Sequence, residues 1–93
     1  MISFAHGVTI PSDVVMREIA DESVILNLDT EIYFGLDDVG TRMWLLLEKS
    51  ETINQAYEAL VDEYDVDPDT LRNDLTELIE SLVSHGLVQL NEV

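Results

Sequence analysis

The first third of the chain alternates apolar and polar residues, as β-strands with one buried face do. Runs rich in valine, isoleucine and aromatic residues occupy positions 14–19, 24–28 and 32–36. The polar segments between them are short enough to be hairpin turns, whereas parallel pairing would need long crossovers. These runs predict a three-stranded antiparallel meander.

From Asp37 onwards the apolar residues recur with helical spacing. The first helix has an apolar face at positions i, i+4, i+7 and i+8, made of Val39, Met43, Leu46 and Leu47. Asp37 or Asp38 can cap this helix. A second helix begins at Thr52, because Thr52 and Gln55 have the spacing of a capping box, which satisfies two backbone N–H groups.

A third helix has the clearest boundaries. Asp67 is placed to cap it, Pro68 suits the first helical position, and Gly86 marks its end. Its apolar stripe consists of Leu71, Leu75, Leu78 and Leu82, and is extended to one side by Ile79 and Val83. The stripe is wider than a small core requires. The apolar residues 87–90 that follow predict a short terminal strand.

The length of 93 residues suffices for one domain with one small core. We expect residues 13–93 to form that domain and residues 1–12 to be a flexible N-terminal segment. Cysteine is absent, which excludes disulfides and thiolate metal ligands. The sequence has neither a secretory signal pattern nor an apolar run long enough to span a membrane, so we expect a cytoplasmic protein.

The charge is strongly negative, with 20 acidic against 4 basic side chains and a formal net charge of −16. Nucleic-acid binders carry basic stripes that neutralise several phosphates, and the four cations here are dispersed along the chain. Anionic membrane surfaces repel such a chain for the same reason. We therefore expect neither nucleic acid nor membrane as a partner.

Catalytic and metal-binding patterns are not found. His6 and His85 are far apart in sequence, and His85 is best placed to interact with a helix C-terminus. Asp65, Asp67 and Asp69 imitate the start of a calcium loop, but the glycine and the final glutamate of that loop are missing. We expect no enzymatic activity, no cofactor and no metal.

Two adjacent aromatic residues, Tyr33 and Phe34, are the most informative side chains of the predicted sheet. Neighbouring strand residues point to opposite faces, so one buried face cannot cover both rings. Either both sides of the strand are packed, or one ring takes part in recognition.

The ordered segments VILNLDTEIYFGLDDVGTRMWLLL and TINQAYEALVDEYDVDPDTLRNDLTELIESLVSHGLV are similar to the PqqD family. This family comprises the peptide chaperone of pyrroloquinoline quinone biosynthesis and the related stand-alone recognition proteins of lasso-peptide pathways. The resemblance covers about residues 14–90. Thr30-Glu31 stands where the family usually has Thr-Gly, and Leu36-Asp37 stands where Leu-Asn is frequent.

The resemblance implies an α+β fold of the winged helix-turn-helix type, with a three-stranded antiparallel sheet followed by three helices. It also implies a non-catalytic adaptor that captures the leader of a ribosomally made precursor peptide by strand addition. The adaptor would deliver that leader to a modifying enzyme or leader peptidase. The implied peptide-binding residues are Tyr33, Phe34 and Leu36 on the third strand and Leu71, Arg72, Leu75 and Ile79 on the third helix. Two alternatives stay open, a general protein-interaction or oligomerisation module and a winged-helix transcriptional regulator.

Overall fold

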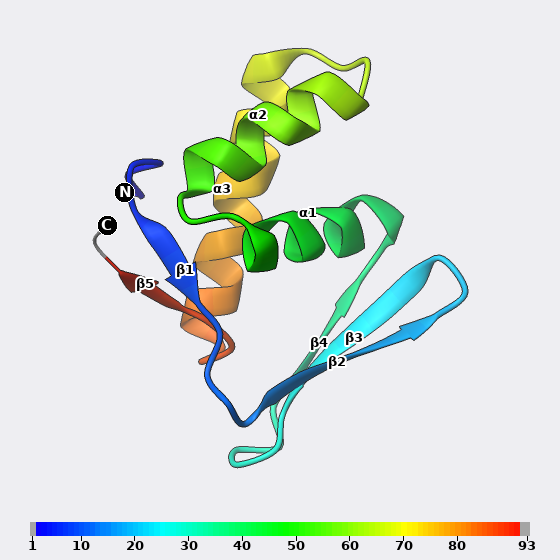
Figure 1. Ribbon diagram of the computed structural model, residues 1–93. Coiled ribbons are helices and arrows are strands. Elements are labelled where there is room, and N and C mark those ends of the chain that lie inside the picture. The colour runs from blue at the N-terminus through cyan, green and yellow to red at the C-terminus, as the bar shows by residue number, and fades with distance from the viewer. Residues whose placement is uncertain (1, 92–93) are drawn as a thin grey trace.

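The computed structural model describes residues 2–91 of the chain. The elements are, in order, β1 (Gly7–Thr9), β2 (Val14–Ile19), β3 (Glu22–Asn27), β4 (Tyr33–Leu36), α1 (Asp38–Lys49), α2 (Ile53–Glu63), α3 (Pro68–Ser84) and β5 (Gln89–Asn91). The predicted α+β fold, in which a three-stranded antiparallel sheet is followed by three helices, is confirmed (Figure 1).

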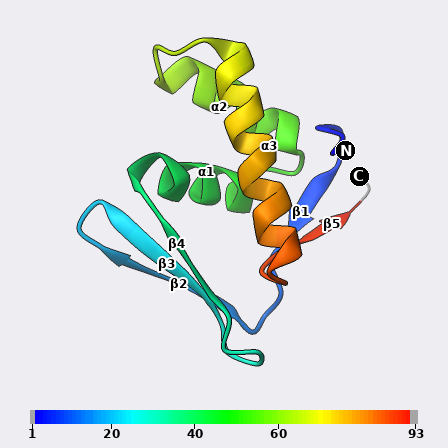
Figure 2. The same ribbon diagram turned by 180° about the vertical axis from the view of Figure 1, so that it is seen from behind.

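Strands β2, β3 and β4 form an antiparallel meander in which β3 is central and β4 is an edge strand. The predicted strand boundaries agree with the observed ones to within two residues. A second sheet pairs β1 with β5, also antiparallel, which brings the two ends of the chain side by side (Figures 1 and 2). A terminal strand is therefore present, at Gln89–Asn91 instead of the predicted 87–90, and its partner lies in the N-terminal segment.

The N-terminal segment is packed against the domain along its described residues 2–12. Phe4 is 6% exposed, and its ring meets that of Tyr57 edge to face at 5.6 Å. The carbonyl groups of Phe4 and His6 accept hydrogen bonds from the first two N–H groups of α2, at 2.9 and 2.8 Å. The sequence did not predict these contacts, because a run this short has no periodicity that separates it from a loop. The flexibility of the segment stays a prediction.

The helix caps mostly follow the sequence. Asp37 caps α1 by accepting from the Gly40 N–H at 2.7 Å. The capping box predicted at Thr52 is complete. Asp67 occupies the N-cap position of α3 but accepts a hydrogen bond from the Thr70 hydroxyl, at 3.3 Å, instead of from a backbone N–H.

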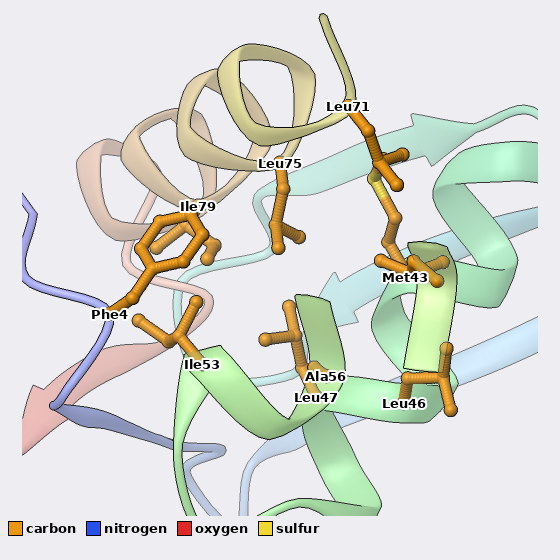
Figure 3. Close-up of a cluster of buried hydrophobic side chains, with 10 residues drawn as sticks. Phe4, Met43, Leu46, Leu47, Ile53, Ala56, Leu71, Leu75 and Ile79 are labelled. Atoms are coloured by element: carbon orange, nitrogen blue, oxygen red, sulfur yellow. The ribbon is translucent and has the colours of Figure 1, made fainter. Parts of the chain in front are cut away.

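Two clusters of buried side chains make up the core. The first lies between the three helices and the N-terminal segment, where Phe4 lies beside Ile53 and Ile79 (Figure 3). The second joins the sheet to α1 and to the end of α3, and consists of Val14, Ile25, Leu36, Trp44, Leu82, Leu87 and Val88. Burial of this apolar surface is the main favourable contribution to folding. Helix α3 contributes to both clusters, so it fixes the sheet relative to the other helices.

Two buried polar residues of β3 hold the sheet in place. The hydroxyl groups of Ser23 and Thr41 are hydrogen bonded at 2.7 Å, which connects β3 to the first turn of α1. Asn27 donates to the Gly86 carbonyl at 3.2 Å and accepts from the N–H groups of Asp29 and Thr30. Buried polar groups need such partners because leaving one unsatisfied costs free energy. These bonds fix β3, and β4 is paired with it.

Candidate functional site

The free edge of β4 exposes unpaired backbone groups. The Asn27 N–H donates to the Ile32 carbonyl at 2.9 Å, so Ile32 faces β3. In an antiparallel ladder the facing direction alternates, so Phe34 and Leu36 also direct their N–H and C=O groups to β3. Tyr33 and Gly35 therefore direct theirs away from the sheet. This edge can accept another strand.

A groove of about 620 Å³ lies along this edge, between β4, the start of α1 and the middle of α3. In Figure 2, β4 is the strand of its sheet that runs closest to α3. The groove is lined by Phe34, Gly35, Leu36, Asp37, Val39, Gly40, Met43, Asp74, Glu77, Leu78 and Ser81. Apolar side chains from all three elements thus lie beside carboxylates of α1's cap and of α3.

The three predicted site residues of β4 lie on two different faces of the sheet. Leu36 is 5% exposed and belongs to the core cluster beneath the sheet, while half-buried Phe34 packs against the same cluster. The Phe34 ring meets the His85 ring edge to face at 5.2 Å. Tyr33 lies on the outer face and is 71% exposed. The structure therefore brings Phe34 and Leu36 to the groove and leaves Tyr33 on the other face.

Helix α3 directs the four residues predicted for binding away from the groove. Leu71, Leu75 and Ile79 are buried against α1, α2 and Phe4. The Arg72 guanidinium lies 4.0 Å from the centre of the Phe4 ring, a cation–π contact on the far side of the helix. These residues hold α3 in place and do not line the groove.

The α3 residues that do line the groove are Asp74, Glu77, Leu78 and Ser81. At about 100° per residue they form the flank of the apolar stripe opposite to Ile79. Sequence reasoning predicted none of these four as binding residues, because the apolar excess of the helix lies on the Ile79 flank, which Phe4 covers. The detectable signal was their i, i+3, i+4 and i+7 spacing along one helical face.

The one ion pair found within residues 2–91 lies outside the groove lining. In that pair Arg42 of α1 donates to both carboxylate oxygens of Glu63 of α2, with the Nε–Oε2 contact at 2.9 Å. These hydrogen bonds lower the pKa of Glu63 and raise the pKa of Arg42. No cation among the described residues pairs with Asp74 or Glu77, so both leave negative charge along the groove.

Comparison with known families places the chain in a family. The family described as Coenzyme PQQ synthesis protein D (PqqD) matches residues 22–88, which run from the first residue of β3 to just before β5. The chain belongs to the PqqD family. No curated protein matches the sequence. The match to the family confirms the resemblance to PqqD proteins found in the sequence.

Two solved structures are similar to this PqqD-family chain. One is described as TbiB1 in complex with the TbiA(beta) leader peptide; it is 40% identical, with a TM-score of 0.79, and covers 87% of this chain and 94% of its own. The other is lasso peptide synthetase B1 complexed with the leader peptide, at 18% identity and a TM-score of 0.77. It covers 88% of this chain and 96% of its own. At that identity the second similarity shows the shared fold alone.

Residues 2–91 contain no group of three or more histidine, aspartate or glutamate side chains placed to hold a metal ion. Within the same residues no helix combines the length and apolar character needed to cross a membrane.

Proposed function

We propose that this protein is a non-catalytic adaptor that binds the leader segment of a ribosomally synthesised precursor peptide. The free edge of β4 beside an apolar groove is the observation that carries the proposal. It is supported by TbiB1, which is 40% identical and was solved with the TbiA(beta) leader peptide. The chain and TbiB1 match over most of both lengths, so the comparison concerns the whole domain.

The leader would bind as an additional strand next to β4. Its backbone would pair with the outward-facing N–H and C=O groups of Tyr33 and Gly35. Every second leader side chain would then point into the groove, toward Phe34 and Leu78. Backbone pairing would supply affinity and the groove would supply selectivity.

The proposed binding residues combine two elements. Strand β4 contributes Tyr33 through its backbone and Phe34 and Leu36 through their side chains. Helix α3 would contribute the groove-lining residues Asp74, Glu77, Leu78 and Ser81. Leu71, Arg72, Leu75 and Ile79 would act by holding α3 at its distance from β4.

The bound leader would then be presented to a partner enzyme, either one that modifies the precursor or a peptidase that removes the leader. Strand addition supports this role, because the opposite edge of the added strand would remain open to a second protein. A precursor made on the ribosome is first available in the cytoplasm, where we place this delivery.

Binding of the TbiA(beta) leader peptide to Tyr33→Pro and Tyr33→Ala tests the proposal. Proline removes the N–H that faces the free edge, whereas alanine keeps it and removes only the exposed ring. We expect Tyr33→Pro to bind at least about tenfold more weakly than Tyr33→Ala, because a backbone hydrogen bond contributes on the order of 1 kcal/mol and proline also disturbs the edge.

Circular dichroism and urea unfolding would establish that both variants are folded. Equal affinities of two folded variants would rule out strand addition at this edge. Absence of leader binding by the folded parent protein would contradict the leader-binding function itself.

A further inference from the structure

A second hollow lies at the end of the sheet beside the cap of α1, and is lined by Ile19, Glu22, Ser23, Val24, Gly35, Leu36 and Asp37. Of these residues, Ile19, Glu22, Val24 and Gly35 belong to the outer face of the sheet. The hollow encloses about 480 Å³ between β4 and the β2–β3 hairpin. Val24 and Ile19 give it an apolar lining, and Ile19 is 71% exposed although it is a large aliphatic residue. Gly35 of β4 lines this hollow as well as the groove.

Gly35 leaves the hollow open because it has no side chain. A Cβ atom added at this position would meet no atom within 4 Å, and the backbone there does not have a positive φ. The backbone conformation therefore does not require glycine. Val24 lies directly opposite Gly35 on β3, so a side chain placed over the glycine would contact Val24.

The strand register determines which residue of an added strand could reach this hollow. The N–H and C=O groups of Gly35 face the free edge, so one residue of the added strand lies directly opposite Gly35. Residues opposite one another in a sheet send their side chains to the same face. That residue would therefore point outward, toward Gly35 and Val24, while its two neighbours point into the groove.

We propose that this hollow binds one large aromatic side chain of the bound peptide, contributed by the residue opposite Gly35. An aromatic ring on a neighbouring strand can lie across a strand glycine and cover the residue beyond it. Here the ring would cover Gly35 and Val24 and bury part of Ile19. The inference rests on the proposed strand addition and adds a selectivity pocket on the outer face of the sheet.

Substitution Gly35→Val tests this inference, because valine would fill the hollow without straining the backbone. Valine also favours strands more than glycine does, so we expect the urea midpoint to be equal or higher than that of the parent. Binding of the TbiA(beta) leader peptide should nevertheless weaken at least tenfold. Val15→Leu is the matched control, since it enlarges a β2 side chain of the same sheet outside the hollow.

An alanine scan of the same leader peptide, measured against the parent and Gly35→Val, identifies the interacting residue. We expect one aromatic leader position whose truncation weakens binding to the parent at least tenfold and binding to Gly35→Val by less than twofold. Parent-like affinity of Gly35→Val overturns the inference. So does a scan in which every truncation has the same effect on both proteins. Neither result contradicts strand addition. Equal binding by Tyr33→Pro and Tyr33→Ala, in contrast, would rule out strand addition at β4, on which this inference rests.

Discussion

Two residues in the hairpin turns of the three-stranded sheet adopt backbone conformations that their side chains disfavour. Glu31, directly before β4's pairing begins, has φ of +62°, and Ala20, between β2 and β3, has φ of +58°. This left-handed region suits glycine, because a Cβ atom there crowds the following carbonyl group. Glu31 stands where the family usually has glycine, so the turn retains the backbone conformation without the residue that favours it.

Replacing Glu31 by glycine should therefore stabilise the protein. We expect Glu31→Gly to raise the free energy of unfolding by about 1 kcal/mol, the usual cost of a left-handed residue with a side chain. Urea unfolding followed by the fluorescence of Trp44, which is buried beside Leu36, would measure the change. Ala20→Gly, at a similar φ in the other hairpin, is the control and should act in the same direction. A destabilised Glu31→Gly would mean that the Glu31 side chain contributes more than its backbone costs.

At the scale of elements, the strands and helices could be predicted from the sequence but the identity of the groove-lining flank could not. Alternation and capping signals are local, so they placed β2, β3, β4 and the helices correctly. Which flank of α3 faces β4 depends on what covers the other flank. That cover is Phe4, which lies far away in sequence and belongs to a segment without periodicity. The missed strand β1 and the prediction of binding residues that lie outside the groove thus have one cause.

A matched pair of truncations separates the two sides of α3. Phe4→Ala should lower the free energy of unfolding by about 3 kcal/mol or more, because it opens a cavity against Ile53 and Ile79. The affinity of its folded state for the TbiA(beta) leader should not change. Phe34→Ala, the same substitution in the groove, should weaken leader binding severalfold in an isothermal titration. Loss of affinity in Phe4→Ala under conditions where it is folded would place the binding site on the other flank.

The contact between α1 and α2 should make stability depend on pH. The hydrogen bonds from Arg42 lower the folded-state pKa of Glu63 below its ordinary value of 4.5. Their contribution is therefore present above about pH 4.5 and disappears as the pH falls through the lowered pKa. Glu63→Gln should be slightly less stable than the parent at pH 7, and the difference should shrink as the pH falls through the lowered pKa of Glu63.

The effect is small because the pair is exposed to solvent. Asp62→Asn removes the same charge from a neighbouring exposed position of α2 and controls for the change in net charge. A Glu63→Gln difference that persists unchanged at low pH would show that the ion pair is not its source.

Over the whole molecule, the charge of −16 acts on anything that approaches the groove. Repulsion between carboxylates opposes the compact state, and the same field attracts cationic peptides. Asp74 and Glu77 place negative charge along the groove itself. The charge should therefore appear in association kinetics more than in the final affinity.

Leader peptides with an added tail of lysines or glutamates test this effect. The lysine-tailed TbiA(beta) leader should associate faster than the glutamate-tailed one at low salt. The two rates should converge at high salt, as the Debye length falls from about 10 Å at 0.1 M to about 3 Å at 1 M. Dissociation rates should differ little, because apolar contacts hold the docked peptide. Equal association rates at low salt would leave solubility as the consequence of the charge.

The pairing of β1 with β5 also determines how the protein would respond to a mechanical load. Gly7 lies opposite Asn91, so both ends leave this sheet at the same side. Tension between the ends would open the ladder one residue pair at a time, as a zipper opens, instead of shearing all its hydrogen bonds together. Phe4 lies before Gly7 and would be extracted first, which would uncover Ile79 on α3. A machine that pulls on either end would thus meet little resistance at first, while the edge strand would still be paired to β3.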